Sequence, residues 1–250
     1  KNEAVYNSLK NSVIYVPYRQ KETILITTYF TGVADPQRNG KWQPKPEELH
    51  PLIASMKGQK LIVLHDCLDA QDTINVKYVR VETRINPYFQ RWFSYYAYLK
   101  ANQHAIDKVF CIDATDITLL KSPFNQVLPG AIYTGDELEV VGCQWLVNHH
   151  KHPVLQKFFA EYKDHQLINA GILGGEVGAI LPFIKDMIDF YFDAESDAFH
   201  KKQPGAGETD MGAFNYMAYT RHQDKIRHGV FVNTKFKANE TNIVSWFKHK

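Results

Sequence analysis

The chain has 250 residues, enough for one large α/β domain or two small ones. Apolar residues make up 44% and charged residues 22%, a balance typical of a globular protein and not of a disordered one. The formal net charge of +2 is too close to neutral to indicate binding to nucleic acid or to an anionic membrane. Three widely spaced cysteines argue against a disulfide framework and a cysteine-based zinc site.

Alternating apolar runs and amphipathic stretches predict an α/β fold, with a mixed, mostly parallel sheet flanked by helices in a single domain over 1–250. In chain order, the predicted strands cover 23–29, 61–66, 76–81, 109–112, 131–134, 140–143, 167–175 and 229–232. The predicted helices cover 47–56, 86–99, 152–162, 177–193 and 209–220.

Three further segments are expected to lie outside these elements. Residues 1–22 are predicted to form an N-terminal extension, 194–208 a mobile loop and 234–250 a C-terminal tail. No apolar run approaches the ~20 residues that a membrane span requires. We therefore expect no transmembrane segment, and a cytoplasmic or membrane-peripheral location.

The most informative stretch is 109–116, an apolar run that ends in two carboxylates, Asp113 and Asp116. Ionised carboxylates at the end of a buried strand are costly to desolvate unless a cation or a hydrogen-bond network compensates them. Asp113 and Asp116 therefore offer hard oxygen ligands to a divalent metal. The alternative is a strand-end turn in which both side chains cap backbone amides.

Three predicted strands end in unusually polar or glycine-rich sequence, at 27–29, 113–116 and 169–175. In open α/β sheets, ligands bind beyond the carboxyl ends of the strands, so these segments predict one cleft. Asp66, at the end of the second strand, is expected to face the same cleft. The glycines within 169–175 either form a bulge or let a bulky ligand approach the backbone.

The order of these motifs resembles that of GT-A-fold glycosyltransferases, which transfer a sugar from a nucleotide diphosphate donor using a metal held by a DxD-type motif. The resemblance extends from Ile24 to the C-terminus, and it lies in the order and spacing of the motifs. Asp113-Ala-Thr-Asp116 is similar to the DxxD variant found in collagen glucosyl- and galactosyltransferase domains. Asp210-Met-Gly-Ala-Phe-Asn215 resembles a D-Q-x-x-F-N segment of several such families, with Met211 in place of the glutamine.

The resemblance implies a metal-dependent hexosyltransferase. Its donor would be a nucleotide diphosphate sugar, with a UDP-sugar favoured, and its acceptor a saccharide or another hydroxyl compound. Asp113 and Asp116 would hold Mn²⁺ or Mg²⁺, with His249 as the third protein ligand. An imidazole nitrogen beside carboxylates suits Mn²⁺ better than Mg²⁺. The alternative for His249 is a solvated residue in a basic tail.

The resemblance also implies donor contacts from several segments of the chain. The residues expected to bind the nucleotide sugar are Thr27, Thr28, Tyr29, Asp66, Arg91, Asn169, Ala170, Gly171 and Lys250. Tyr29 would stack on the base, Asn169 would bind a sugar hydroxyl, and Lys250 would pair with the diphosphate as a point charge. Arg91 would reach the strand-end carboxylates or the donor, although a surface salt bridge is its alternative.

Asp210 and Glu208 are the carboxylates expected to act in catalysis. In an inverting enzyme Asp210 would remove the acceptor proton as general base. In a retaining enzyme the leaving phosphate would take that role, and the similar families favour retention. The loop 194–208 would close over the donor and exclude water, and the tail 234–250 would close the active site.

Other functions are also compatible with strand-end carboxylates. A sugar nucleotidyltransferase shares the nucleotide-binding half of the fold, but the loop after the first strand, 28–32, has little of the Gly, Lys and Arg that such enzymes use. A non-catalytic nucleotide-sugar-binding module would have kept the fold and lost turnover, and the intact Asp113, Asp116 and Asp210 argue against it. A dehalogenase-like phosphatase would need an aspartate where Thr115 stands.

Overall fold

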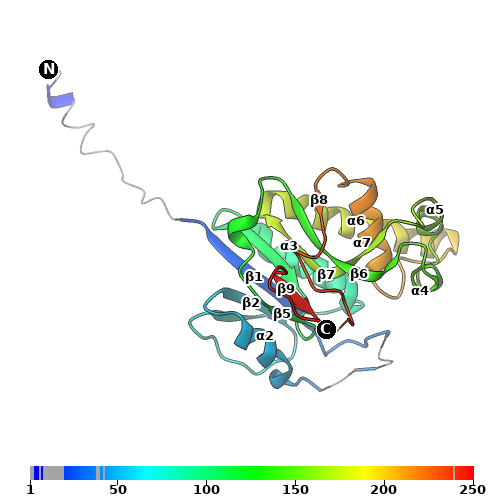
Figure 1. Cartoon of the computed structure of the whole chain (residues 1–250), viewed down its shortest axis with the longest axis horizontal. Coiled ribbons are helices and arrows are strands. Elements are labelled where there is room, and N and C mark those ends of the chain that lie inside the picture. Colours follow the sequence, from blue (N-terminus) through cyan, green and yellow to red (C-terminus); the bar gives the residue numbers. More distant parts are fainter. Residues whose placement is uncertain (1–2, 6, 8–19, 38–39, 42, 239) are drawn as a thin grey trace.

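The centre of the molecule is a seven-stranded sheet with the strand order β3-β2-β1-β4-β7-β6-β8 (Figure 1). The computed structural model describes residues 3–5, 7, 20–37, 40–41, 43–238 and 240–250. The strands of this sheet are β1 (Glu22–Tyr29), β2 (Lys60–His65), β3 (Val76–Arg80), β4 (Ile106–Ile112), β6 (Ile132–Val140), β7 (Gln166–Glu176) and β8 (Ile226–Arg227). The pairings of β7 with β4 and β6 are antiparallel, and the four other pairings are parallel. The chain is therefore an α/β protein with a mostly parallel, mixed sheet, compatible with a Rossmann-like fold.

A smaller antiparallel sheet pairs β5 (Ile117–Leu119) with β9 (Phe247–His249), so the end of the chain returns to the segment that follows β4. The helical segments are η1 (Pro46–Leu49), α2 (His50–Ser55), α3 (Pro87–Asn102), η2 (Phe124–Gln126), α4 (Gln144–His149), α5 (Pro153–Glu161), α6 (Val177–Lys201) and α7 (Met211–Thr220). Within the described residues, we find no helix with the length and apolar character needed to traverse a bilayer.

Two apolar cores lie on the two faces of the large sheet. One face packs on α3, α5, α6 and α7, and the other packs on α2 and the β5–β9 pair (Figure 1). Strand β1 shows how the sequence serves both cores, because successive side chains of a strand point to opposite faces. Ile24 and Ile26 enter the first core, whereas Leu25 and Tyr29 enter the second.

The local signals for strands and helices are largely confirmed. The predicted edge strand 76–81 is β3, at one end of the sheet. Helix α3 begins as predicted, with Pro87 in its first turn and the Asn86 Oδ1 atom accepting a hydrogen bond from the Tyr88 amide at 2.9 Å. Gly58 follows α2 with a φ of 85°, a left-handed conformation that glycine adopts without a steric penalty.

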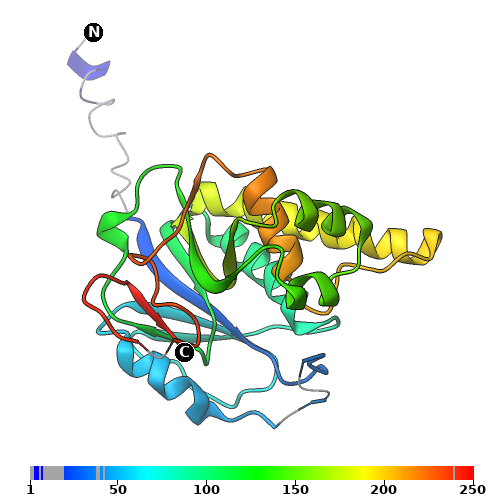
Figure 2. The ribbon, with the colours of Figure 1, turned by 45° about the vertical axis from the view of Figure 1, so that its right-hand side comes forward.

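The predicted mobile loop 194–208 is wrong for its first half, because α6 continues to Lys201 (Figure 2). The sequence from 194 to 201 contains no glycine or proline, and the pair Asp197–Lys201 at 2.8 Å supports a further helical turn. The remaining segment is tied down in this structure. The Ala206 amide donates to Glu195 Oε1 at 3.0 Å, and the Glu208 carbonyl accepts from Asn86 Nδ2 at 2.8 Å.

Two predicted strands are also wrong. The expected strand 131–134 is confirmed as the beginning of β6, whereas 140–143 is not a separate strand, because β6 ends at Val140 and the chain turns there into α4. The segment 229–232 forms a turn, with Gly229 at φ 129°, while its apolar Val232 is still fully buried. An apolar run that is buried in a turn therefore has the same sequence pattern as a short strand. Apart from 3–5, 7 and 20–22, the predicted N-terminal extension lies outside the described residues.

Candidate active site

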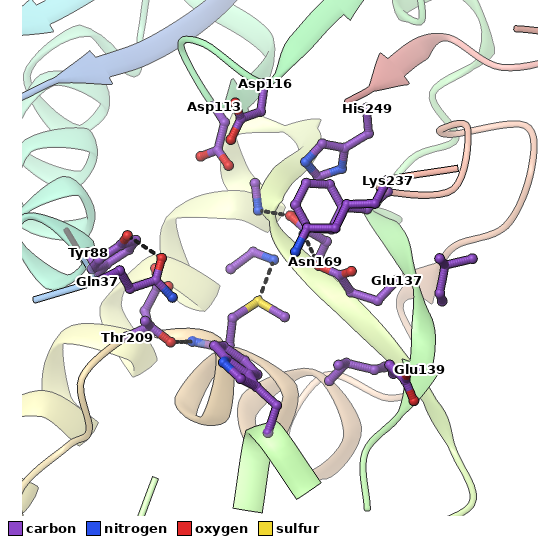
Figure 3. A pocket seen from close by; sticks show the side chains of 18 of the residues that line it. Gln37, Tyr88, Asp113, Asp116, Glu137, Glu139, Asn169, Thr209, Lys237 and His249 are labelled. Carbon is purple, nitrogen blue, oxygen red and sulfur yellow. Dashed lines mark hydrogen bonds between the residues drawn. The ribbon is translucent and has the colours of Figure 1, made fainter. Parts of the chain in front are cut away.

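A cavity of about 480 Å³ lies beyond the carboxyl end of β4, a volume within the range of small-molecule sites (Figure 3). Its floor is the outer part of the β6–β7 pair: Ile112 at the end of β4 pairs with Ile172, and residues 166–171 of β7 continue past that point. Helix α3, the start of α7 and the C-terminal tail supply the walls. Eight of the residues expected from sequence line it, namely Arg91, Asp113, Asp116, Asn169, Ala170, Gly171, Asp210 and His249.

The turn that carries Asp113 and Asp116 connects β4 to β5 at the upper end of the cavity in Figure 3. The Asp113 amide donates to the Gly171 carbonyl at 3.0 Å, which joins this turn to β7. A Cβ atom at Gly171 would collide with the side chains of Asp113 and Asn169. The glycine is therefore needed so that two of the protein's own polar groups can approach the β7 backbone.

A buried cluster of charges links the turn to α3 and α7. Arg91 donates from Nη1 to Asp113 Oδ1 at 2.7 Å and from Nε to Asp210 Oδ2 at 2.7 Å. Trp92 Nε1 donates to the same Asp210 oxygen, also at 2.7 Å. The side chains of Arg91 and Asp210 are 10% and 1% exposed, so Arg91 is a buried ion-pair residue and not a surface one. Charge-assisted contacts of this geometry hold the guanidinium rigidly beside the carboxylate of Asp113.

The environment of Asp210 points to a supporting role. Burial raises the pKa of the Asp210 carboxyl, and its contact with Arg91 opposes that shift. Its Oδ1 atom is buried and has no hydrogen-bond partner among the described residues. A general base must reach the acceptor hydroxyl. The carboxylate is 1% exposed and is engaged by Arg91 and Trp92, so in this structure it holds Arg91 in place, while its catalytic role stays a prediction.

His249 reaches the cavity because β9 pairs with β5 and thereby sets His249 opposite Ile117. The imidazole is 1% exposed, contacts the ring of Phe236 at a centroid distance of 4.5 Å, and has no hydrogen-bond partner for Nδ1 in the described part of the chain. Burial lowers the pKa of His249 to about 4, although the negative charge of Asp113 acts in the opposite direction. The imidazole is therefore neutral at physiological pH, which is the form that binds metals.

The chemistry of Asp113, Asp116 and His249 fits a divalent cation, since two carboxylates and one neutral imidazole line a single cavity (Figure 3). As they stand, no three His, Cys, Asp or Glu side chains of the described residues are close enough together to enclose an ion. One oxygen of Asp113 is already engaged by Arg91. A bound cation would thus share Asp113 with Arg91 and would draw the three ligands toward one another.

The floor of the cavity carries polar groups from both β6 and β7. Asn169 donates from Nδ2 to Glu137 Oε1 and accepts the Gly171 amide at 2.5 Å through Oδ1. Burial raises the pKa of the Glu137 carboxyl, with the Asn169 contact opposing the shift. Met211, which stands where the resembled segment has a glutamine, accepts the Ala170 amide through Sδ at 3.3 Å. Its thioether thus meets the backbone of β7 at the cavity wall.

A smaller depression of about 140 Å³ adjoins the large cavity and shares Arg91, Asp113 and Asp116 with it. Thr28 and Tyr29 line this depression, as expected, but Thr27 is fully buried and lines neither space. The ring of Tyr29 is 4% exposed and packs in the core with α2. Stacking of a nucleotide base on Tyr29 is therefore not supported by this arrangement.

Asp66 lies outside the cavity. Its carboxylate accepts the amides of Thr31 and Gly32 at 3.0 and 2.9 Å and the hydroxyl of Thr83 at 2.9 Å. These bonds fix the loop that follows β1, so the expected donor contact from Asp66 is replaced by a structural one. A strand-end carboxylate that accepts backbone amides has the same sequence pattern as one that faces a ligand.

Glu208 and Lys250 differ in their relation to the site. The Glu208 side chain is exposed and is not part of the cavity lining, so its expected catalytic role is not supported by its position. Lys250 is exposed too, but its Nζ atom donates to the Thr115 carbonyl at 3.2 Å and its amide to the Asp116 carbonyl at 2.9 Å. Lys250 thus places a positive charge directly against the turn that carries Asp113 and Asp116.

Asn215 of the D-M-x-x-F-N segment has a structural role. It is fully buried, accepts the Ile168 amide at 3.0 Å and donates to the Ile168 carbonyl at 2.9 Å, so it pairs with β7 as a neighbouring strand would. We predict that Asn215→Ala lowers the free energy of unfolding by about 2–4 kcal/mol, because it leaves buried backbone groups without partners. Urea unfolding measures this loss. Asn148→Ala, at an exposed position, should change little, and equal effects of both substitutions would contradict the assignment.

Sequence comparisons do not identify the chain. No known protein family matches it, and neither does any curated protein.

Proposed function

We propose that this chain is a metal-dependent glycosyltransferase of GT-A type that takes its sugar from a nucleotide diphosphate donor. The observation that carries the proposal is the meeting of Asp113, Asp116 and a neutral His249 at one cavity beyond the end of β4, at the position where open α/β sheets bind ligands. Arg91, Lys237 and Lys250 place positive charge at or beside the same end of the cavity. This combination suits a diphosphate together with its cation.

Each of these residues would have a separate role in such a transfer. A divalent cation held by Asp113, Asp116 and His249 would stabilise the negative charge that develops on the departing diphosphate. Arg91 fixes the orientation of Asp113, and Asp210 in turn fixes Arg91. Asn169, on the cavity floor, offers its amide to a hydroxyl of the donor sugar. During transfer the bond from the anomeric carbon to the diphosphate oxygen breaks, a bond to the acceptor oxygen forms, and the proton of the acceptor hydroxyl passes to the departing diphosphate.

A sugar nucleotidyltransferase is less well supported. Enzymes of that kind use the loop after the first strand to hold phosphates, and here the amides of Thr31 and Gly32 are already bonded to Asp66. Backbone amides that are engaged by a buried carboxylate are not available to an anionic ligand, and the carboxylate itself would repel it. The glycosyltransferase is therefore the better account of the cavity.

We predict that His249→Ala weakens Mn²⁺ binding about 10- to 100-fold, because the imidazole is the one nitrogen donor of the proposed ligand set. Calorimetric titration of Mn²⁺ into the protein, in the presence of a nucleoside diphosphate, measures the affinity. His200→Ala, in the last turn of α6, removes a comparable side chain away from the cavity and should leave the affinity unchanged. Equal affinity in His249→Ala and wild type would remove His249 from the ligand set.

A thermal-shift screen of nucleotide diphosphate sugars, each with and without Mn²⁺, tests the proposal and identifies the donor. A ligand present at ~100 times its dissociation constant adds about 2.7 kcal/mol of apparent stability, which is easily visible as a raised midpoint. We expect a shift that requires donor and Mn²⁺ together. A folded protein that no donor stabilises, with or without Mn²⁺, would overturn the proposal.

A further inference from the structure

The large cavity has two chemically different ends. Asp113, Asp116 and His249 lie at one end, and Glu139 lies at the other, on the far side of Glu137 and Asn169 (Figure 3). The far end contains none of the groups assigned above to the donor's diphosphate. If the diphosphate and its cation occupy the first end, the far end is left for the molecule that receives the sugar.

An exposed indole lines the cavity together with Glu139. Trp145 belongs to the short helix α4, is 40% exposed, and stacks on the ring of His149 with a centroid distance of 5.1 Å and an interplanar angle of 29°. The His149 Nδ1 atom also bonds to the Trp145 carbonyl at 2.8 Å. The indole is therefore supported from one side by its own helix while part of its surface remains in contact with the cavity.

Leu138, which directly precedes Glu139, adds a second exposed apolar residue to the lining and is 55% exposed. It stands on β6 between Glu137 and Glu139, and all three residues contribute to the lining. An aromatic surface with neighbouring carboxylates matches the two faces of a pyranose ring. The C–H groups of the sugar pack on the indole, and its hydroxyls donate hydrogen bonds to the carboxylates.

We propose that Trp145, Leu138 and Glu139 form the acceptor site, and that the acceptor is a neutral pyranoside. This inference rests on the proposed glycosyltransferase function, and it narrows the acceptor from any hydroxyl compound to one class of carbohydrate. Glu137 and Glu139 set the charge preference, because two carboxylates in one cavity repel an acidic sugar. Glu137 is the inner of the two and contacts Asn169, so it lies between the donor and acceptor ends.

Saturation-transfer NMR with methyl β-D-glucopyranoside, methyl β-D-galactopyranoside and methyl α-D-mannopyranoside tests the site on the intact protein. We expect at least one of these glycosides to bind, and Trp145→Ala to weaken its binding roughly tenfold, as expected for the loss of a stacking surface. Trp145→Phe should retain most of the affinity. Phe199→Ala removes an aromatic side chain that is 81% exposed outside the cavity, and it should have no effect.

A comparison of acidic and neutral glycosides tests the charge preference. Methyl β-D-glucuronide should bind several-fold more weakly than methyl β-D-glucopyranoside. Glu139→Gln should reduce this difference in affinity between the two glycosides. Absence of binding by all three neutral glycosides, or equal binding in wild type and Trp145→Ala, would overturn the acceptor site. Equal binding of glucuronide and glucoside would overturn the charge preference.

Donor binding separates this inference from the function on which it rests. Calorimetry with the donor and Mn²⁺ should give the same affinity in wild type and Trp145→Ala, because Trp145 is not among the residues proposed to hold the donor or its cation. Donor binding without glycoside binding would overturn the acceptor site alone. Glycoside binding that depends on Trp145, in a protein that binds no donor, would support a carbohydrate site but overturn the transferase.

Discussion

Asp113→Asn is expected to lower glycosyl transfer by roughly 100-fold or more, the size of effect seen when a group that stabilises developing charge is removed. The substitution keeps the shape of the side chain but removes the negative charge that the proposed cation requires. Because the Asp113 side chain is 30% exposed and Arg91 retains its contact with Asp210, we expect the free energy of unfolding to fall by no more than about 2 kcal/mol. Turnover assays at saturating Mn²⁺, together with urea unfolding, measure both quantities.

Asp189→Asn is the matched control for this experiment. Asp189 is a surface carboxylate that pairs with Lys185 on α6, and its substitution should leave turnover and folding unchanged. A folded Asp113→Asn protein with wild-type turnover would eliminate the metal assignment. Loss of turnover in Asp189→Asn as well would show that the assay responds to charge in general and not to this site.

Arg91→Met is expected to have the largest effect on stability, a loss of about 3–5 kcal/mol, because it leaves the carboxylate of Asp210 buried without a counter-charge. The Asp210 side chain is 1% exposed, so the charge that it keeps is poorly solvated. Replacing both partners, as in Arg91→Met with Asp210→Leu, should recover much of the loss, because no buried charge then remains. Chemical unfolding of the two single variants and the double variant measures the coupling.

Arg84→Met provides the comparison for Arg91→Met. Arg84 pairs with Glu82 on the surface, where its side chain is 76% exposed, and we expect no measurable change in stability. A small effect of Arg91→Met, similar to that of Arg84→Met, would contradict the buried cluster. Failure of the double variant to recover stability would mean that Arg91 contributes mainly through packing against Trp92, over whose ring its guanidinium lies at 5.0 Å.

The parts of the fold that sequence predicted well depend on local signals. Strand β4 is a short apolar run bounded by polar residues, and α3 begins with an asparagine cap and a proline. The meeting of Asp113 with Asn169 was also predictable, because polar segments that end or flank neighbouring strands lie together at one edge of a sheet. His249 was expected there only through the resemblance, and the pairing of β9 with β5 supplies the physical reason.

The site residues that sequence assigned wrongly or missed depend on how the strands and loops are placed in space. Thr27 and Asp66 lie near strand ends as Asp113 does, but neither reaches the cavity. Thr27 is fully buried, and the Asp66 carboxylate accepts the backbone amides of Thr31 and Gly32. Glu137 and Trp145 reach the cavity because the β6–β7 pair continues past β4, and nothing in the sequence marks how far a strand extends. The length of α6 was underestimated because its last two turns are polar and exposed and resemble a loop.

The most direct test of the account is the release of nucleoside diphosphate from the donor that the thermal-shift screen identifies, in the presence of a methyl pyranoside, with Mn²⁺ or with EDTA. The account predicts release with Mn²⁺, its abolition by EDTA, and a matching loss in Asp113→Asn while Asp189→Asn behaves as wild type. Release that is equal with Mn²⁺ and EDTA, or that persists in Asp113→Asn, would contradict a metal-dependent transferase built on Asp113, Asp116 and His249.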